Sequence, residues 1–226
     1  MKPKICVSLK AKTVDELEWK AKRALDIGGD LVELRLDYLA NPFSEDLIKL
    51  IIDIGDRAIV TFRPWWEGGE YRGEENLRVK LLEELARLKP AYVDIELRTI
   101  KKEVNLGKKT RRIISWHSLD KTPSFSMLTE TVSEMLRLGD ISKIVIKINS
   151  FEENLKILRL FKIFPPERLI AFGIDDSGIA SRILSMIIGS PITYTCLPGE
   201  EVAPGQLTVG EVIEVMNLLE GRGLWR

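Results

Sequence analysis

The sequence predicts an α/β fold, a (β/α)₈ barrel formed by a single domain over residues 1–226. Short β-branched runs alternate with amphipathic segments eight times, which indicates parallel strands joined by helical crossovers. A chain of 226 residues lies near the lower end of the range for such a barrel. No Gly-x-Gly-x-x-Gly follows the first run and no P-loop is present, so an open nucleotide-binding sheet lacks its usual signature.

Each predicted strand is a short apolar run, and each is followed by a helical pattern. In the run 143–149, Ile144, Val145, Ile146 and Ile148 are apolar, so both faces are expected to be covered, as in parallel sheets. Thr13 and Glu16 have the spacing of a capping box, which predicts where the first helix begins. The predicted strands are residues 4–9, 30–37, 57–63, 91–97, 111–118, 143–149, 168–174 and 191–197. The predicted helical segments are residues 13–27, 44–54, 74–88, 99–107 (a helix or a turn), 126–138, 151–163, 177–188 and 208–219.

Composition excludes several classes of function. Lys and Arg together number 34, as do Asp and Glu, so the chain has no net charge to attract nucleic acid or an anionic membrane. The start of the chain lacks the pattern of a signal peptide, and no apolar run is long enough to span a bilayer. Cys6 and Cys196 lie in separate apolar runs and are expected to be buried free thiols. We therefore expect a cytoplasmic protein with a small-molecule substrate and neither nucleic acid nor membrane as a partner.

Polar side chains gather where the predicted strands end, which is where barrels of this type form their active sites. Ionisable groups are costly inside a barrel unless they are paired, so their number indicates a functional site. The alternative is that some of them, such as Glu33 with Arg35, are ion pairs between neighbouring strands. The residues concerned are Ser8, Glu33, Arg35, Arg63, Glu67, Asp94, Glu96, His117, Lys147, Arg182 and Gln206.

Lys147 and His117 end adjacent predicted strands and form a chemically coherent pair. A lysine among isoleucines is favoured as a neutral amine, which can attack a carbonyl and form an imine, and a histidine can transfer the protons. The alternative is that Lys147 extends its ammonium into solvent from the strand end. Lys143 belongs to the same strand with the same parity, but it lies at the strand's start, toward the opposite face of the barrel. The nucleophile is therefore predicted to be Lys147.

The chain resembles the type I 3-dehydroquinate dehydratases, a family of shikimate-pathway enzymes with a (β/α)₈ barrel. Seven motifs, in order and covering nearly the whole chain, carry the resemblance. They are Val32-Glu33-Leu34-Arg35-Leu36-Asp37, Thr61-Phe62-Arg63 with Glu67-Gly68-Gly69-Glu70, Asp94-Ile95-Glu96, Ser115-Trp116-His117, Lys147-Ile148, Gly178-Ile179-Ala180-Ser181-Arg182 and Ala203-Pro204-Gly205-Gln206.

The resemblance implies a dehydration of 3-dehydroquinate to 3-dehydroshikimate that needs no cofactor and no metal. Lys147 would form an imine with the substrate ketone, and His117 would remove the adjacent proton and then assist the departure of water. Glu67 would orient His117. Among the expected substrate contacts, Arg182 would bind the carboxylate and Gln206 the hydroxyl groups. The remaining expected contacts are Ser8, Glu33, Arg35 and Arg63, with Asp94 and Glu96 behind them. The resemblance also implies a homodimer.

The chain departs from the family pattern at two places. Val202 stands where the lid motif has a serine, so one substrate hydrogen bond is absent or comes from Glu200 or Glu201. Trp65 and Trp66 are bulkier than expected in their loop, and they either pack over the site or lie at the surface.

Three other functions compete with this interpretation. A class I aldolase acting on a sugar phosphate is opposed by Asp175 and Asp176 in the loop that would hold the phosphate. A catalytically inactive barrel that serves as a binding protein is opposed by the full set of reactive residues. A metal-dependent lyase is disfavoured because the chain has one histidine.

Overall fold

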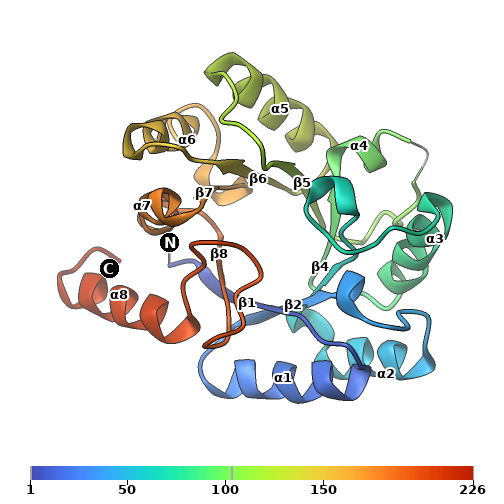
Figure 1. The fold of residues 1–226 in the computed structure, drawn as a ribbon. Coiled ribbons are helices and arrows are strands. Elements are labelled where there is room, and N and C mark those ends of the chain that lie inside the picture. Colours follow the sequence, from blue (N-terminus) through green and yellow to red (C-terminus); the bar gives the residue numbers. More distant parts are fainter. Residues whose placement is uncertain (1, 103, 226) are drawn as a thin grey trace.

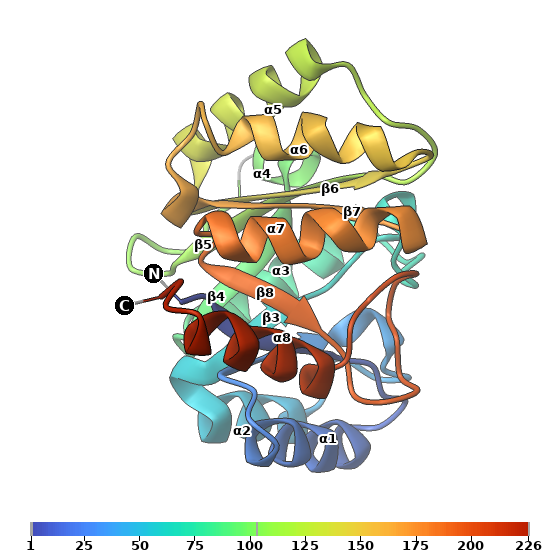
Figure 2. The same cartoon turned by 90° about the vertical axis from the view of Figure 1, so that its left-hand side faces the viewer.

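The computed structural model describes residues 2–102 and 104–225, and this part of the chain forms a barrel of parallel strands surrounded by helices (Figures 1 and 2). The two ends of the predicted domain and residue 103 of the predicted segment 99–107 lie outside the described residues. The strands are β1 (Lys4–Leu9), β2 (Leu31–Arg35), β3 (Ala58–Thr61), β4 (Tyr92–Glu96), β5 (Arg112–Ser118), β6 (Ile141–Lys147), β7 (Leu169–Ile174) and β8 (Ile192–Thr195). The helices are α1 (Val14–Asp26), α2 (Glu45–Ile54), α3 (Glu75–Ala86), α4 (Leu97–Ile100), α5 (Phe125–Leu138), α6 (Asn154–Leu160), α7 (Ile179–Ile188) and α8 (Val209–Gly221).

The strand order confirms the predicted barrel class. The eight strands pair in the order β7-β6-β5-β4-β3-β2-β1-β8, and all seven of these neighbouring pairs are parallel. Among the described residues no hydrogen-bonded ladder joins β7 to β8, so the barrel is nearly closed and has one seam. The seam matters below because side chains of the site lie on both of its strands.

The inside of the barrel is built in layers, because alternate residues of each strand point inward. The first inward layer is apolar: Cys6, Leu31, Ile59, Tyr92, Ile113, Ile141, Ile170 and Ile192. The next inward layer, two residues further along each strand, is largely polar: Ser8, Glu33, Thr61, Asp94, Ser115, Lys143, Phe172 and Tyr194. The apolar layer therefore forms a floor, and the ionisable groups stand on it toward the carboxyl ends of the strands.

Two local predictions need adjustment. The segment predicted at 99–107 forms a helix only over Leu97–Ile100, a single turn that follows β4 directly. Thr13 caps α1 as expected, with its hydroxyl accepting from the Glu16 amide, but the Glu16 carboxylate accepts from Lys12 N instead of closing the box. A complete capping box occurs at the start of α8. Cys6 and Cys196 are both free and buried, as predicted.

In the described part of the chain, none of the helices has both the length and the apolar character that crossing a bilayer requires.

Candidate active site

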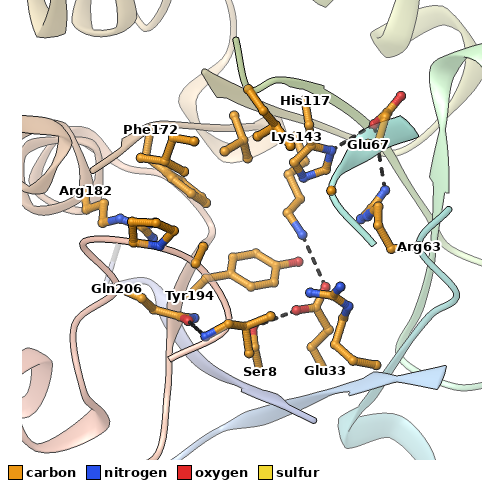
Figure 3. Close-up of a pocket in the computed structure, with 18 residues that line it drawn as sticks. Ser8, Glu33, Arg63, Glu67, His117, Lys143, Phe172, Arg182, Tyr194 and Gln206 are labelled. Carbon is orange, nitrogen blue, oxygen red and sulfur yellow. Dashed lines mark hydrogen bonds and ion pairs between the residues drawn. The ribbon is translucent and has the colours of Figure 1, made fainter. Parts of the chain in front are cut away.

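A cavity of about 190 Å³ opens at the carboxyl ends of the strands (Figure 3). All of the predicted substrate-binding residues line it, together with two of the three predicted catalytic residues. The predicted residues in the lining are Ser8, Glu33, Arg35, Arg63, Glu67, His117, Arg182 and Gln206. The other residues in the lining are Gly68, Leu119, Lys143, Val145, Phe172, Ile174, Tyr194, Val202, Ala203 and Pro204.

The lysine in the cavity is Lys143, so the predicted position of Lys147 in the site is wrong. Lys147 is the last residue of β6 and does not line the cavity, and its backbone carbonyl accepts a hydrogen bond from Thr122. The misplacement arose because β6 begins at Ile141 and not at residue 143. Lys143 is thus the second inward residue of its strand, level with Glu33 and Asp94, and its long side chain reaches the cavity from there.

The Lys143 amine is surrounded by acceptors and an aromatic face. Its Nζ donates to Glu33 Oε1 at 3.2 Å and to Asp94 Oδ2 at 3.0 Å, and it lies 3.9 Å from the centroid of the Tyr194 ring. Burial opposes ionisation of both carboxylates, but the cations around them outweigh it and lower the pKa of Glu33 and of Asp94. Both therefore stay ionised near neutral pH and balance a positive charge on the lysine nitrogen.

His117, which is partly buried, and the buried Glu67 form a pair beside this lysine. His117 Nδ1 and Glu67 Oε2 are 2.8 Å apart, which directs the second ring nitrogen away from Glu67 (Figure 3). Burial lowers the pKa of His117 well below its ordinary value of 6.5, and the nearby Arg63 and Lys143 lower it further. Burial likewise raises the pKa of Glu67 to about 8. The pair therefore resists carrying a net charge, and His117 has a free imidazole near neutral pH.

The raised pKa of Glu67 predicts that Glu67→Gln stabilises the fold increasingly as the pH rises. The folded protein binds a proton on Glu67 up to about pH 8, whereas the unfolded chain releases it near 4.5. The stability that Glu67 contributes is thus fully present below 4.5 and is lost as the pH rises through 8. Urea unfolding of both proteins at pH 5, 7 and 9 should show the gain from the glutamine growing with pH.

Glu75→Gln is the matched control for this measurement. Burial opposes ionisation of Glu75 too, but hydrogen bonds from Arg78 and Thr99 prevail and lower its pKa. The contribution of Glu75 to stability is therefore already complete above pH 4.5. Glu75→Gln should then lower the stability by the same amount at pH 7 and at pH 9. A gain from Glu67→Gln that is the same at pH 5 and pH 9 would contradict the raised pKa of Glu67.

Arg63 is the centre of the ion pairs behind the catalytic groups. Its guanidinium contacts Asp94 Oδ1 at 2.8 Å and Glu96 Oε1 at 2.7 Å, and it donates to Ser115 Oγ at 2.6 Å. Glu96 is held from its other side by Arg78, which is fully buried. Ion pairs between strands therefore exist, but they run through Arg63 and Lys143: within the described residues Glu33 pairs with Lys143, and Arg35 pairs with Asp37 instead of Glu33.

Arg182 is the cation of the cavity that no anion neutralises. Arg182 lies in the first turn of α7 and is 6% exposed. Its Nε and Nη2 have no hydrogen-bond partner within the described residues. Burial lowers its pKa to about 10. Unpaired buried donors are costly, so a guanidinium held in this way is suited to a planar, anionic ligand group such as a carboxylate.

The loop after β8 closes one side of the cavity and is held by its own residues. Gln206 accepts from Val202 N at 2.8 Å and donates to Thr195 O at 2.9 Å, so its amide braces the loop as well as lining the cavity. Val202 lines the cavity at the serine position of the lid motif. The carboxylate of Glu200 pairs with Lys20 at 2.7 Å, and neither Glu200 nor Glu201 lines the cavity, so neither replaces that serine.

The remaining predicted residues have partners of their own. Ser8 donates to Glu33 at 2.6 Å, and Arg35 forms a two-point contact with Asp37. Of the two tryptophans, neither lines the cavity: Trp65 is 52% exposed, and Trp66 contacts Arg98.

Sequence reasoning missed Phe172 and Tyr194, which line the cavity from β7 and β8. An apolar or aromatic residue inside a strand carries no signal that separates a cavity wall from the core. Among residues 2–102 and 104–225, no cluster of three or more His, Cys, Asp or Glu side chains is arranged to hold a metal ion.

Comparison with known proteins identifies the family. The family described as type I 3-dehydroquinase matches residues 5–222. A 3-dehydroquinate dehydratase from Methanococcus vannielii is 36% identical over 225 residues, which span 96% of this chain and 100% of that protein. Another, from Methanothermobacter thermautotrophicus, is 36% identical over 211 residues, 92% of this chain and 94% of that protein.

Solved structures show the same similarity. The 3-dehydroquinate dehydratase of Aquifex aeolicus VF5 superimposes with a TM-score of 0.80 at 31% identity, covering 95% of this chain and 98% of that one. A type I 3-dehydroquinate dehydratase from Clostridium difficile, described with covalent modified comenic acid, gives a TM-score of 0.86 at 27% identity, covering 98% and 93%. Because the family match extends over almost the whole barrel, the chain belongs to the type I 3-dehydroquinase family.

Proposed function

We propose that the protein dehydrates 3-dehydroquinate to 3-dehydroshikimate through an imine between the substrate ketone and Lys143. One observation carries the proposal: the Lys143 amine and the His117 imidazole line the same cavity as the unpaired guanidinium of Arg182. A nucleophile, a proton-transfer group and an anion-binding group are the three elements that the reaction of a keto acid requires. Members of this family are lyases, and their names specify the same substrate.

Each step of the reaction can be assigned to a residue of the cavity. Lys143 releases one proton of its ammonium to water and attacks the ketone carbon as the free amine. The ketone oxygen takes one proton from that nitrogen and one back from water, and it leaves as water, which forms a protonated imine. This cation withdraws electrons from the neighbouring carbon, so His117 can remove a proton there and leave an enamine. The enamine electrons then expel the hydroxyl group on the next carbon, which takes the proton from His117 and departs as water. Hydrolysis of the imine releases the product and restores Lys143.

The charges around Lys143 favour the cationic stages of this sequence. Glu33 and Asp94 remain ionised and lie 3.2 and 3.0 Å from its nitrogen. A protonated imine at this nitrogen would keep both interactions, because it has the same charge and position as the ammonium. Preorganised charges of this kind stabilise a cation without reorganisation during the reaction.

Arg182 gives the substrate its orientation. Its two unpartnered nitrogens, Nε and Nη2, lie on one edge of the guanidinium and can donate to both oxygens of a carboxylate. We expect the substrate carboxylate there. Because Arg182 follows β7 and Lys143 lies on β6, the carboxylate and the ketone of one molecule would be held by groups from neighbouring strands.

Borohydride trapping tests this function directly. Borohydride reduces an imine to a stable amine, so incubation with 3-dehydroquinate and borohydride should leave an adduct that peptide mass mapping places on Lys143. An adduct on Lys147 would contradict the placement of the nucleophile. Dehydration without any adduct would contradict the imine mechanism, and the absence of both would favour an inactive barrel or, if sugar phosphates react, an aldolase.

The biological setting follows from the proposed reaction. We assign the protein to the shikimate pathway of aromatic amino acid biosynthesis, since the family's substrate and product belong there. The homodimer, the cytoplasmic location and the lack of nucleic-acid or membrane partners stay predictions.

A further inference from the structure

The seam of the barrel is bridged by two aromatic rings of the cavity. Phe172 lies on β7 and Tyr194 on β8, the two strands that no ladder joins within the described residues. Their ring centroids are 6.3 Å apart with an interplanar angle of 43°. Both side chains are almost fully buried and line the cavity (Figure 3). Ring packing therefore supplies a contact where backbone hydrogen bonds do not.

Each ring also carries one of the cations that the proposed reaction uses. Arg182 Cζ lies 4.2 Å from the Phe172 centroid, and Lys143 Nζ lies 3.9 Å from the Tyr194 centroid. Both distances are well within the range of a cation–π interaction, which is strongest when the groups are removed from water. Arg182, which is expected to bind the carboxylate, thus contacts one ring of the aromatic pair, and Lys143, which is expected to form the imine, contacts the other.

For Arg182 the ring contact has particular weight. The other buried cations of the site all have carboxylate partners: Arg63 and Lys143 each contact at least two, and Arg35 contacts Asp37. Arg182 forms no ion pair in the described part of the chain, and its guanidinium lies against the Phe172 ring. The quadrupole of that ring supplies negative potential while leaving the polar edge of the guanidinium free for a ligand.

The Tyr194 contact works differently, because Lys143 already has two carboxylates. A carboxylate can rotate or take part in another hydrogen bond, whereas a buried ring is fixed by its packing. The Tyr194 hydroxyl is buried and has no hydrogen-bond partner among the described residues. The ring face and not the hydroxyl is therefore the part of Tyr194 that contacts the lysine.

We propose that Phe172 and Tyr194 are positioning residues that set the separation between Arg182 and Lys143 and thereby select keto acids of matching length. The inference rests on the proposed function, since it assigns the carboxylate to Arg182 and the ketone to Lys143. In 3-dehydroquinate these two groups occupy a 1,3 relation on a six-membered ring. The two rings face each other across the only unpaired seam found in the described barrel, and each ring supports one of the two binding groups.

The test compares variants that lose a ring with variants that keep it. Phe172→Leu and Tyr194→Leu retain apolar bulk but lose the π face, whereas Phe172→Tyr and Tyr194→Phe retain it. Loss of one cation–π contact should change KM or kcat, depending on the cation concerned, roughly tenfold. We expect Phe172→Leu to raise KM mainly, because Arg182 serves substrate binding, and Tyr194→Leu to lower kcat and the rate of borohydride trapping. The ring-keeping variants should lose less in each case.

Selectivity for length gives a readout that general loosening of the fold does not produce. Wild-type protein is trapped with borohydride in the presence of 3-oxocyclohexanecarboxylate or 4-oxocyclohexanecarboxylate, which differ only in the separation of ketone and carboxylate. The wild type should prefer the 3-oxo acid. Both leucine variants should lose much of that preference, and the ring-keeping variants should retain it.

Tyr92→Leu is the matched control elsewhere in the barrel. Tyr92 is a buried strand tyrosine with a cation on its face, Arg111 at 4.3 Å, but it lies in the floor layer and not in the cavity. This variant should leave kcat, KM and the trapping preference as in wild type, and its thermal unfolding gives the cost of losing such a ring.

The outcomes separate the inference from the function on which it rests. If wild type dehydrates 3-dehydroquinate but the leucine variants match the ring-keeping variants in kinetics and preference, the positioning role is overturned. The same holds if Tyr92→Leu changes the preference as much. If wild type neither dehydrates 3-dehydroquinate nor forms an adduct, the proposed function itself fails and the inference fails with it.

Discussion

Lys143→Met is expected to abolish dehydration of 3-dehydroquinate, with kcat falling at least roughly 10⁴-fold, as is usual when a covalent nucleophile is removed. Methionine keeps an unbranched chain of similar length but has no amine, so no imine can form. No borohydride adduct should appear in the peptide that contains position 143. Steady-state kinetics and mass mapping of the same preparation measure both effects.

Lys147→Met is the matched control, because it changes a lysine of the same strand that does not line the cavity. It should dehydrate and be trapped as wild type does. Lys143→Met also leaves Glu33 and Asp94 without their shared cation, so its thermal unfolding must be measured alongside. Activity that survives in Lys143→Met but is lost in folded Lys147→Met would return the nucleophile to Lys147.

His117→Ala should lower kcat by roughly 10² to 10⁴-fold, the usual contribution of general acid–base catalysis, while an adduct still forms on Lys143. The histidine moves protons but is not the nucleophile. This variant should therefore still form the imine and be slowed at the later removal of the carbon proton. The deprotonation step requires the tautomer in which Nδ1 donates its proton to Glu67, because only that tautomer leaves Nε2 free to accept a proton. Loss of both the adduct and the activity in a folded His117→Ala protein would mean that His117 is required before the imine forms.

The pH dependence of kcat/KM, which reports the groups of the free enzyme, follows from the burial of His117. Its pKa is lowered below 6.5, so the uncharged imidazole that accepts the proton persists below that pH. In wild type, titration of His117 should therefore leave kcat/KM unchanged down to pH 6.5 and lower it only in more acidic solution. A decline that begins above pH 6.5 would contradict this assignment.

Much of the barrel could be predicted from the chain because its signals are local. β-branched runs such as the one around Ile144 alternate with amphipathic segments, and this pattern depends only on which residues are apolar. The position of β6 shows the limit of such reasoning. Its true start at Ile141 shifts Lys143 from the edge of the barrel to the charged layer, and a shift of two residues at a strand end lies within the ordinary uncertainty of reading boundaries from sequence.

The sequence predicted which residues lie in the site better than it predicted the contacts among them. The motif residues lie together as expected, with Lys147 as the exception, since each stands near the carboxyl end of a strand and the barrel brings those ends together. The partners could not be predicted. Arg63 was expected to contact substrate, yet its guanidinium is occupied by Asp94, Glu96 and Ser115, and this depends on side chains of two other strands, β4 and β5.

Strand periodicity and the order of the motifs along the chain are enough to specify a (β/α)₈ barrel with a reactive set of residues at one end. The packing of the folded barrel sets which lysine reaches the cavity, which cation lacks an anion, and which rings support the cations. Those properties arise from distances between residues far apart in sequence. Lys143 and Glu33 meet across 110 positions of the chain, and only closure of the barrel brings them within 3.2 Å.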